Sequence, residues 1–397
     1  MLAGFPLLAA LLAPSDGVEA VARWMRELDG RVPEARAVVT VLAPHGETAA
    51  EALAGLLGEE LLPGWQRTLA TVPSACASQL AEDATGHAAL QAFGIAIASR
   101  FGDDQAVAPL LALCLADASK SLDEDADVDR FATSLCRIAE REPHALGTST
   151  LDRVPREWRA PLAARLGRSA RPEAAPWLLS LLSGDPTVEP TALLALARLA
   201  RALEGALVLD EVQERRVLFC LDSGDATTRG AAAQAVGRLD LVEAAPLLVE
   251  RLRDPSPPVR SAAAGALGVL TDLRLGNQPR AWDSWLTDQQ AWWHERGETI
   301  LRQLSLARGS DLTHALRAAA TARLHRRVLG PAIARLLEDQ ESGTVEAALA
   351  ALEALRPRCC RASVERVATT HSDPRIAARA RRLAARLGAD LSGTDRS

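Results

Sequence analysis

The chain has 397 residues and a net charge of −6, from 45 basic and 51 acidic side chains. This mild acidity argues against a dedicated nucleic-acid binder, and its single lysine, Lys120, follows a serine, which excludes the usual phosphate-binding loop. Hydrophobic residues make up 48% of the chain but aromatic residues only 3%, with Ala and Leu dominant. That composition predicts an all-α protein.

The chain opens with a short apolar run at residues 2–13. Such a run suits either the first helix of the protein or the apolar part of a secretory signal. No basic residue precedes it, Pro6 interrupts it, and Pro14 directly follows the one small-residue cleavage point, Ala13. We therefore expect a helix here and a cytoplasmic protein, with export as the alternative. No other segment approaches the length of a membrane span.

Residues 30–165 read as helices of about 10–16 residues with short connections, and as degenerate repeats. An acidic run from Asp123 to Asp129 superficially resembles a calcium loop. Val128 stands where that loop needs glycine, and Ser134 where it needs a bidentate glutamate. The run is instead expected to be a solvated loop whose last acids favour the positive end of the next helix.

An internal repeat is the strongest signal in the chain. Residues 228–237 are echoed 31 residues later by residues 259–268, with Arg229 matching Arg260 and a glycine ending both segments. A fixed period in this range indicates stacked supersecondary units, none of which can bury its apolar face alone.

Proline marks the boundaries of these units in two ways. An Ala-Pro pair opens an apolar helix at Pro109, Pro176 and Pro246, and a weaker copy is at Pro331. An Asp-Pro pair, in which the acid can cap the following helix, occurs at Asp185, Asp254 and Asp373. The predicted unit is therefore a pair of antiparallel helices.

The segment Asp254–Gly268 resembles the HEAT-like repeat family, including its phycobilisome-lyase type, in its Asp-Pro, Val-Arg and Ala-Leu-Gly sequence. The resemblance is strong over residues 170–275 and 373–387. It implies a right-handed α-solenoid of stacked antiparallel helix pairs, HEAT-like or armadillo-like, in a bacterial protein, and it implies no particular reaction. The expected divisions are degenerate repeats at 1–165, HEAT-like repeats at 166–275, a Trp-rich insert at 276–296, and repeats with an Arg-rich capping helix at 297–397.

The insert carries half of the tryptophans of the chain. On a helix, Trp282, Trp285, Trp292 and Trp293 share one broad face. We expect this face to fill a step in the solenoid, with Trp285 and one of Trp292 and Trp293 mostly buried. The alternative is a groove for a protein partner, because Trp is frequent among interface hot spots.

Catalytic and metal-binding signals are weak. One His-Glu pair, His294-Glu295, invites comparison with a HEAT-like di-iron hydroxylase, which needs several such pairs. No Ser-His-Asp elbow is present. We expect no cofactor, no metal and no catalytic residues. The six cysteines fit no zinc pattern and are expected to be small buried hydrophobes in a reducing compartment: Cys76, Cys114, Cys136, Cys220, Cys359 and Cys360.

The last helix has an arginine stripe formed by Arg375, Arg379, Arg382 and Arg386, which flanks an apolar stripe one position later. We expect a solvent-facing cap that ends the stack, with an acidic partner or polyanion patch as the alternative. The sequence as a whole predicts a non-catalytic scaffold or adaptor for a protein partner of unknown identity. The alternatives are a lyase-like or hydroxylase-like HEAT enzyme and a nucleic-acid-binding repeat protein.

Overall fold

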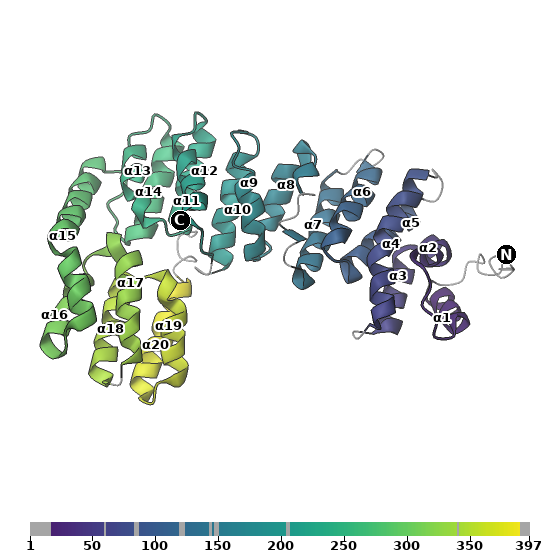
Figure 1. Cartoon of the computed structure of the whole chain (residues 1–397). Coiled ribbons are helices and arrows are strands. Elements are labelled where there is room, and N and C mark those ends of the chain that lie inside the picture. The colour runs from purple at the N-terminus through teal and green to yellow at the C-terminus, as the bar shows by residue number, and fades with distance from the viewer. Residues whose placement is uncertain are drawn as a thin grey trace. The chain divides into compact units, whose positions relative to one another are not determined.

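The computed structural model describes residues 17–58, 61–82, 87–118, 124–142, 145–146, 151–203, 207–339 and 341–389. Across these residues the regular structure is entirely helical (Figure 1), which confirms the predicted all-α class. The apolar run at residues 2–13 lies outside them. The chain divides into two compact units, Met1–Ser169 and Ala170–Ser397. No helix in the described part of the chain is long and apolar enough to cross a membrane.

The N-terminal unit is built from two rows of helices. Its helices are α1 (Gly17–Leu28), α2 (Ala35–Leu42), α3 (Gly46–Leu57), α4 (Pro63–Glu82), α5 (His87–Phe101), α6 (Val107–Ala118), α7 (Glu124–Arg141) and α8 (Arg156–Leu166). The odd-numbered helices α1, α3, α5 and α7 pack in one row, and α2, α4 and α6 pack in the other. From α1 to α7, alternate helices along the chain thus touch each other, which is the packing of a repeat array.

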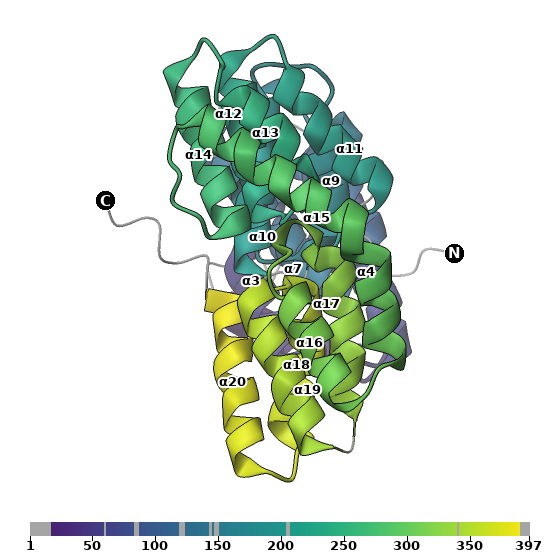
Figure 2. The same ribbon diagram turned by 90° about the vertical axis from the view of Figure 1, so that its left-hand side faces the viewer.

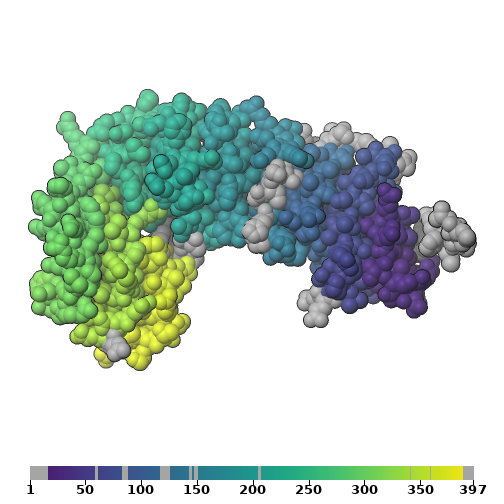
Figure 3. All heavy atoms as spheres, in the orientation of Figure 1, coloured from purple at the N-terminus to yellow at the C-terminus, as the bar shows by residue number. Residues whose placement is uncertain are grey.

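The C-terminal unit continues this pattern. Its helices are α9 (Ala175–Ser180), α10 (Glu189–Ala202), α11 (Glu211–Phe219), α12 (Ala226–Arg238), α13 (Ala245–Arg251), α14 (Pro257–Thr271), α15 (Pro279–Leu306), α16 (Gly309–Ala319), α17 (Arg326–Ala334), α18 (Ser342–Leu355), α19 (Arg361–Thr370) and α20 (Pro374–Ala389). Helices α10, α12 and α14 form one tightly packed row, and α16, α18 and α20 form another. Side chains fill the spaces between neighbouring helices (Figure 3).

The 28-residue helix α15 separates these two rows. It packs against α13 on one side and against α16 and α17 on the other, whereas α14 has no comparable packing against α16. In both ribbon views α16, α18 and α20 lie side by side, away from α10, α12 and α14 (Figure 1, Figure 2). The row of α10, α12 and α14 therefore ends at α14, whereas in a regular array α16 would pack against α14 and continue it.

The sequence punctuation explains most helix starts. Pro176 and Pro246 lie in the first turn of α9 and α13, as predicted, where their missing N–H costs nothing. Pro331 differs, since it lies inside α17 rather than opening a helix. The described part of the acidic run, residues 124–129, also differs from the expected loop, because it forms the first turns of α7, with Asp127 buried.

The repeated arginine and the Asp-Pro pair lock adjacent units together. Arg229 of α12 makes a bidentate ion pair with Asp254, through Nε–Oδ2 at 2.7 Å and Nη2–Oδ1 at 3.0 Å. The Arg229 guanidinium also donates to the carbonyl oxygen of Ser223, six residues earlier, at 2.8 Å. Arg260 of the next unit repeats that contact by donating to the Asp254 carbonyl at 2.8 Å. The matching arginines therefore fix the turn before their own helix.

Candidate partner-binding site

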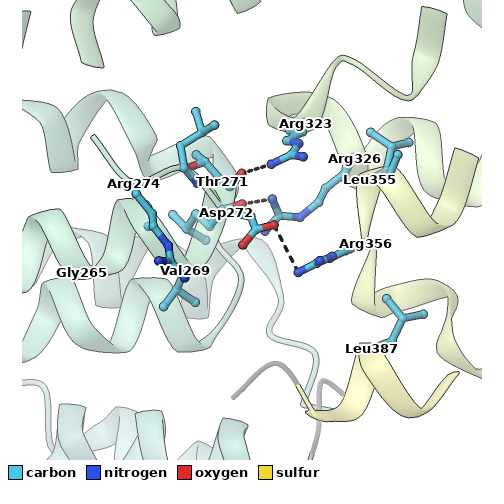
Figure 4. Close-up of a pocket in the computed structure, with 14 residues that line it drawn as sticks. Gly265, Val269, Thr271, Asp272, Arg274, Arg323, Arg326, Leu355, Arg356 and Leu387 are labelled. Atoms are coloured by element: carbon cyan, nitrogen blue, oxygen red, sulfur yellow. Dashed lines mark hydrogen bonds and ion pairs between the residues drawn. The ribbon is translucent and has the colours of Figure 1, made fainter. Parts of the chain in front are cut away.

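A pocket of about 320 Å³ lies where the row of α14 is interrupted. It is formed by the C-terminal end of α14, the residues around the start of α17, and the C-terminal end of α18, with Leu387 of α20 at one side (Figure 4). Four arginines line it, and they come from three separate parts of the chain: Arg274, Arg323, Arg326 and Arg356. Asp272 is the one acidic residue in its lining.

Two of these arginines bind the C-terminal end of α14. Arg323 donates from Nη1 to the carbonyl oxygen of Thr271 at 2.6 Å. Arg326 donates to the carbonyl of Leu270 and forms an ion pair with Asp240. The last carbonyls of α14 lack partners within the helix and carry the negative end of its dipole, so cationic donors stabilise this end.

Arg326 is the most buried charge of the pocket, at 5% exposure. Its Nε is a buried nitrogen without a hydrogen-bond partner in the described residues. The neighbouring Arg327 bridges Glu214 at 2.6 Å and Glu243 at 3.1 Å. The start of α17 is thus tied by ion pairs to α11 and to the residues between α12 and α13, which holds Arg323 and Arg326 in place beside α14.

Arg356 reaches the pocket from the end of α18 and contacts Asp272 at 3.3 Å (Figure 4). Both residues have left-handed backbone conformations, with φ of 52° and 58°. Arg274 is exposed on the segment after α14. Leu355, Leu387 and Val269 supply an apolar wall. The pocket therefore offers a surplus of guanidinium groups beside aliphatic surface, which suits a carboxylate attached to an apolar chain.

The tryptophan face lies on the first half of α15, as its spacing predicted. Trp282 is completely buried and donates from Nε1 to the Gly276 carbonyl at 2.9 Å. Trp285, Trp292 and Trp293 are each partly buried, and Trp292 and Trp293 pack against the core of the C-terminal helices. Trp293 stacks on the His325 ring, with centroids 4.1 Å apart. This face thus joins α15 to the start of α17.

The arginine stripe on α20 divides into two pairs. Arg379 and Arg386 both form ion pairs with Glu353 of α18, while Arg375 and Arg382 are exposed. The flanking apolar stripe is buried, as expected for a helix that covers the end of a stack. Arg379 also contacts Glu346 at 3.7 Å, so two glutamates offset two of the four charges, and the stripe presents less positive charge than its sequence indicates.

The other candidate metal-binding and catalytic residues do not come together in one site. His294 and Glu295 are both exposed on α15, and the described residues contain no group of three or more His, Cys, Asp or Glu side chains placed to hold a metal ion. Four cysteines are buried and Cys136 is partly buried, but Cys359 is exposed, contrary to the expectation for all six.

Sequence reasoning missed the pocket arginines. Arg323 and Arg326 belong to no periodic stripe, and they lie more than 50 residues from the α14 carbonyls that they bind. The available signal was the Arg-Leu-His-Arg-Arg sequence at residues 323–327, in which three arginines are crowded around the start of a helix.

The rows of stacked helices, taken together, define the class of the protein as an all-α solenoid of HEAT-like repeats. A comparison with protein-family models agrees, since residues 214–283 match the family described as HEAT repeats. The matched segment runs from α11 into α15 and includes the Arg229–Asp254 pair. A search of curated proteins found no significant match to the chain.

Proposed function

We propose that this protein is a non-catalytic scaffold or adaptor that binds an acidic segment of a partner protein in the arginine-lined pocket of its C-terminal unit. The observation that carries this proposal is the excess of arginine in the lining: Arg326 is paired with Asp240 and Arg356 with Asp272, whereas Arg274 and Arg323 face the pocket without a lining carboxylate of their own. Stacked helix pairs commonly present extended surfaces to other proteins, which supports a binding role for the array.

The chemistry of the pocket indicates what the segment contains. Guanidinium groups bind carboxylates through paired hydrogen bonds, so one or two Asp or Glu side chains should enter. The volume of about 320 Å³ is at the small end of ligand pockets, enough for a few side chains. The wall formed by Val269, Leu355 and Leu387 favours an apolar side chain next to the acid. A short acidic and aliphatic motif satisfies both requirements.

Two alternatives have less support. Tight binding of a nucleic-acid duplex needs a basic surface along many phosphates, whereas the chain carries a net charge of −6 and pairs Arg379 and Arg386 internally. An enzyme needs convergent nucleophilic or acid-base groups in a cleft, and the pocket lining contains arginines, one aspartate, one threonine and otherwise apolar residues. The partly buried Trp285 and Trp292 and the exposed Arg375 and Arg382 stay proposed as contacts for parts of the partner protein outside the acidic segment, and a cytoplasmic location stays proposed.

The test uses the full-length protein and a fluorescein-labelled synthetic peptide in which Glu and Leu alternate between Gly-Ser spacers. Fluorescence anisotropy at about 150 mM salt, where the Debye length is about 8 Å, measures specific contact rather than long-range attraction. We expect saturable binding that weakens about tenfold or more in Arg323→Gln and in Arg356→Gln, since each removes a charged donor from the pocket.

The matched control is the double variant Arg375→Gln with Arg382→Gln, which removes two exposed arginines of the same unit outside the pocket. It should bind the peptide like the wild type, and a peptide with Gln in place of Glu should bind to neither protein. Circular dichroism melting verifies that each variant is folded. Equal affinity for the Glu and Gln peptides, or binding that is lost only in the α20 double variant, would contradict the pocket as the site.

A further inference from the structure

The adjacent cysteines Cys359 and Cys360 differ from the other cysteines in their surroundings. They end the short 3-10 turn Arg358–Cys360 that leads into α19. The Cys359 side chain is exposed and that of Cys360 is buried, and their sulfur atoms are 3.7 Å apart. No other cysteine in the described residues combines exposure with a second thiol in contact, since Cys76, Cys114 and Cys220 are buried and Cys136 is partly buried.

The surroundings favour a thiolate at Cys359. The contact with the Cys360 thiol, which can donate its proton, is the main cause that lowers the pKa of Cys359 to about 7, and the positive charge of Arg327 adds to it, against desolvation of the sulfur and the charge of Asp240. The same contact and burial raise the pKa of Cys360. Burial raises the pKa values of Cys76 and Cys220 to about 12. Cys360 is also the N-cap residue of α19, so the cysteine pair directly precedes the positive end of that helix.

The two sulfur atoms also differ in their access to solvent. The buried Cys360 sulfur lies against Gly330 of α17, where a side-chain β-carbon would be only 3.1 Å away. A reagent from solvent therefore meets Cys359 first and Cys360 second. Thiols that respond to oxidants share this arrangement, in which an accessible thiolate of lowered pKa stands next to a second, resolving thiol.

We propose that Cys359 and Cys360 form an oxidant-sensitive dithiol, in which a hydroperoxide oxidises Cys359 and Cys360 then closes a reversible disulfide with it. In the first step the Cys359 thiolate attacks one peroxide oxygen, the O–O bond breaks, and the departing alkoxide or hydroxide takes up a proton. In the second step the Cys360 sulfur, losing its proton, attacks the sulfenic sulfur of Cys359, and the S–O bond breaks with release of water. The two sulfurs lose two electrons in total, and the peroxide gains them.

The product should be easy to reduce. The α-carbons of residues joined by a trans peptide are about 3.8 Å apart, whereas ordinary disulfides span about 4.4 Å or more. A bond between adjacent cysteines is therefore strained, and strained disulfides have more oxidising potentials and are reduced readily. This chemistry fits a reversible modification rather than a permanent cross-link. The proposal is independent of the partner-binding pocket.

The test treats the reduced full-length protein with one equivalent of hydrogen peroxide and follows the proteolytic peptide containing residues 359–360 by mass spectrometry after alkylation. We expect this peptide to lose two hydrogen atoms and both alkylation sites before any other cysteine reacts, and glutathione to restore them. In Cys360→Ser the reaction should stop at a sulfenic acid that dimedone traps on Cys359. In Cys359→Ser, Cys360 should stay reduced.

Three results would overturn the proposal. They are oxidation of Cys136 ahead of Cys359, direct conversion of wild-type Cys359 to sulfinic acid without loss of two hydrogens at the pair, and unchanged oxidation of Cys360 in Cys359→Ser. Because Cys359 is exposed, its substitution should leave melting unchanged, so a failure of Cys359→Ser to oxidise reports on chemistry rather than unfolding. Cys360→Ala is the second variant if Cys360→Ser does not fold.

Discussion

Asp272 and Arg356, the left-handed C-cap residues of α14 and α18, form an ion pair at 3.3 Å across the arginine-lined pocket. Glycine is the usual residue at such positions, because a β-carbon there costs about 1–2 kcal/mol. The pair is solvent-exposed, and exposed pairs contribute about 0–1 kcal/mol. The ion pair therefore does not offset the backbone cost of keeping both side chains. Side chains kept at strained positions are often there for binding.

Replacing Arg356 with glycine should therefore raise stability while it weakens binding. We expect Arg356→Gly to increase the free energy of unfolding by about 0.5–1 kcal/mol, because relief of the left-handed strain exceeds the loss of an exposed ion pair. Binding of the acidic peptide should fall about tenfold. Thermal melting and peptide anisotropy measure the two effects on the same sample.

Arg356→Ala is the matched control for this substitution. It removes the guanidinium but keeps a β-carbon at φ 52°, so it should lose binding without gaining stability. If the glycine variant melts below the alanine variant, the strain argument is wrong. If both bind the peptide normally, Arg356 has no part in the site.

The Arg229–Asp254 pair should make the C-terminal unit sensitive to acid. The hydrogen-bonded Arg229 guanidinium is the main cause that lowers the pKa of Asp254 in the folded protein. A carboxyl whose folded pKa is depressed contributes stability that is complete above its unfolded pKa of about 3.9 and is lost as pH falls toward the folded value. Asp254→Asn should cost about 3 kcal/mol at pH 7, because it leaves a largely buried Arg229 without its charge partner.

Melting curves at pH 7 and pH 3 test this expectation. The difference between wild type and Asp254→Asn should shrink at pH 3, where the wild-type pair begins to be lost. The exposed pair of Arg253 and Asp283, at 2.5 Å, provides the comparison, and Asp283→Asn should cost less than about 1 kcal/mol. An equal cost for both substitutions would show that burial of the Arg229 pair has no energetic consequence.

The repeated glycines should respond in opposite directions to alanine. At Gly237 of α12 a β-carbon would lie 3.0 Å from the α-carbon of Ala266, so an added methyl group would require the α14 backbone to shift by a few tenths of an ångström. At Gly268 of α14 the nearest atom would be the Leu273 carbonyl oxygen at 3.5 Å, an ordinary contact. Gly237→Ala should destabilise by about 1–3 kcal/mol, whereas Gly268→Ala should stabilise by up to about 1 kcal/mol through helix propensity. Thermal melting of both variants against the wild type tests this expectation. An increase in stability of Gly237→Ala would show that the close approach of α12 and α14 does not disfavour a side chain there.

Tryptophan substitutions should separate core from surface on α15. Trp282→Ala should cost about 3–5 kcal/mol, because it opens a cavity in a fully buried site and removes the bond to Gly276. Trp285→Ala, at a partly exposed position, should cost less than half as much. Thermal melting measures both. A Trp285 variant that melts normally but loses the acidic peptide would instead place this residue in the partner interface.

The sequence alone determined the features that depend on neighbouring residues. The 31-residue echo, the Ala-Pro helix starts and the buried stripe of α20 were all readable, because helix formation and stacking of adjacent repeats follow local periodicity. The HEAT-like segment could be recognised for the same reason. Its ion pair joins Arg229 and Asp254, which are only 25 residues apart and belong to successive units.

Only the tertiary structure decided where the candidate site lies. The length of α15 interrupts the row of α14, and the resulting gap brings Arg323, Arg326 and Arg356 to helix ends that are distant along the chain. The division of the α20 stripe likewise depends on Glu353, a residue of another helix. Local periodicity carries no information about such contacts, because they are set by how whole helices pack after they form.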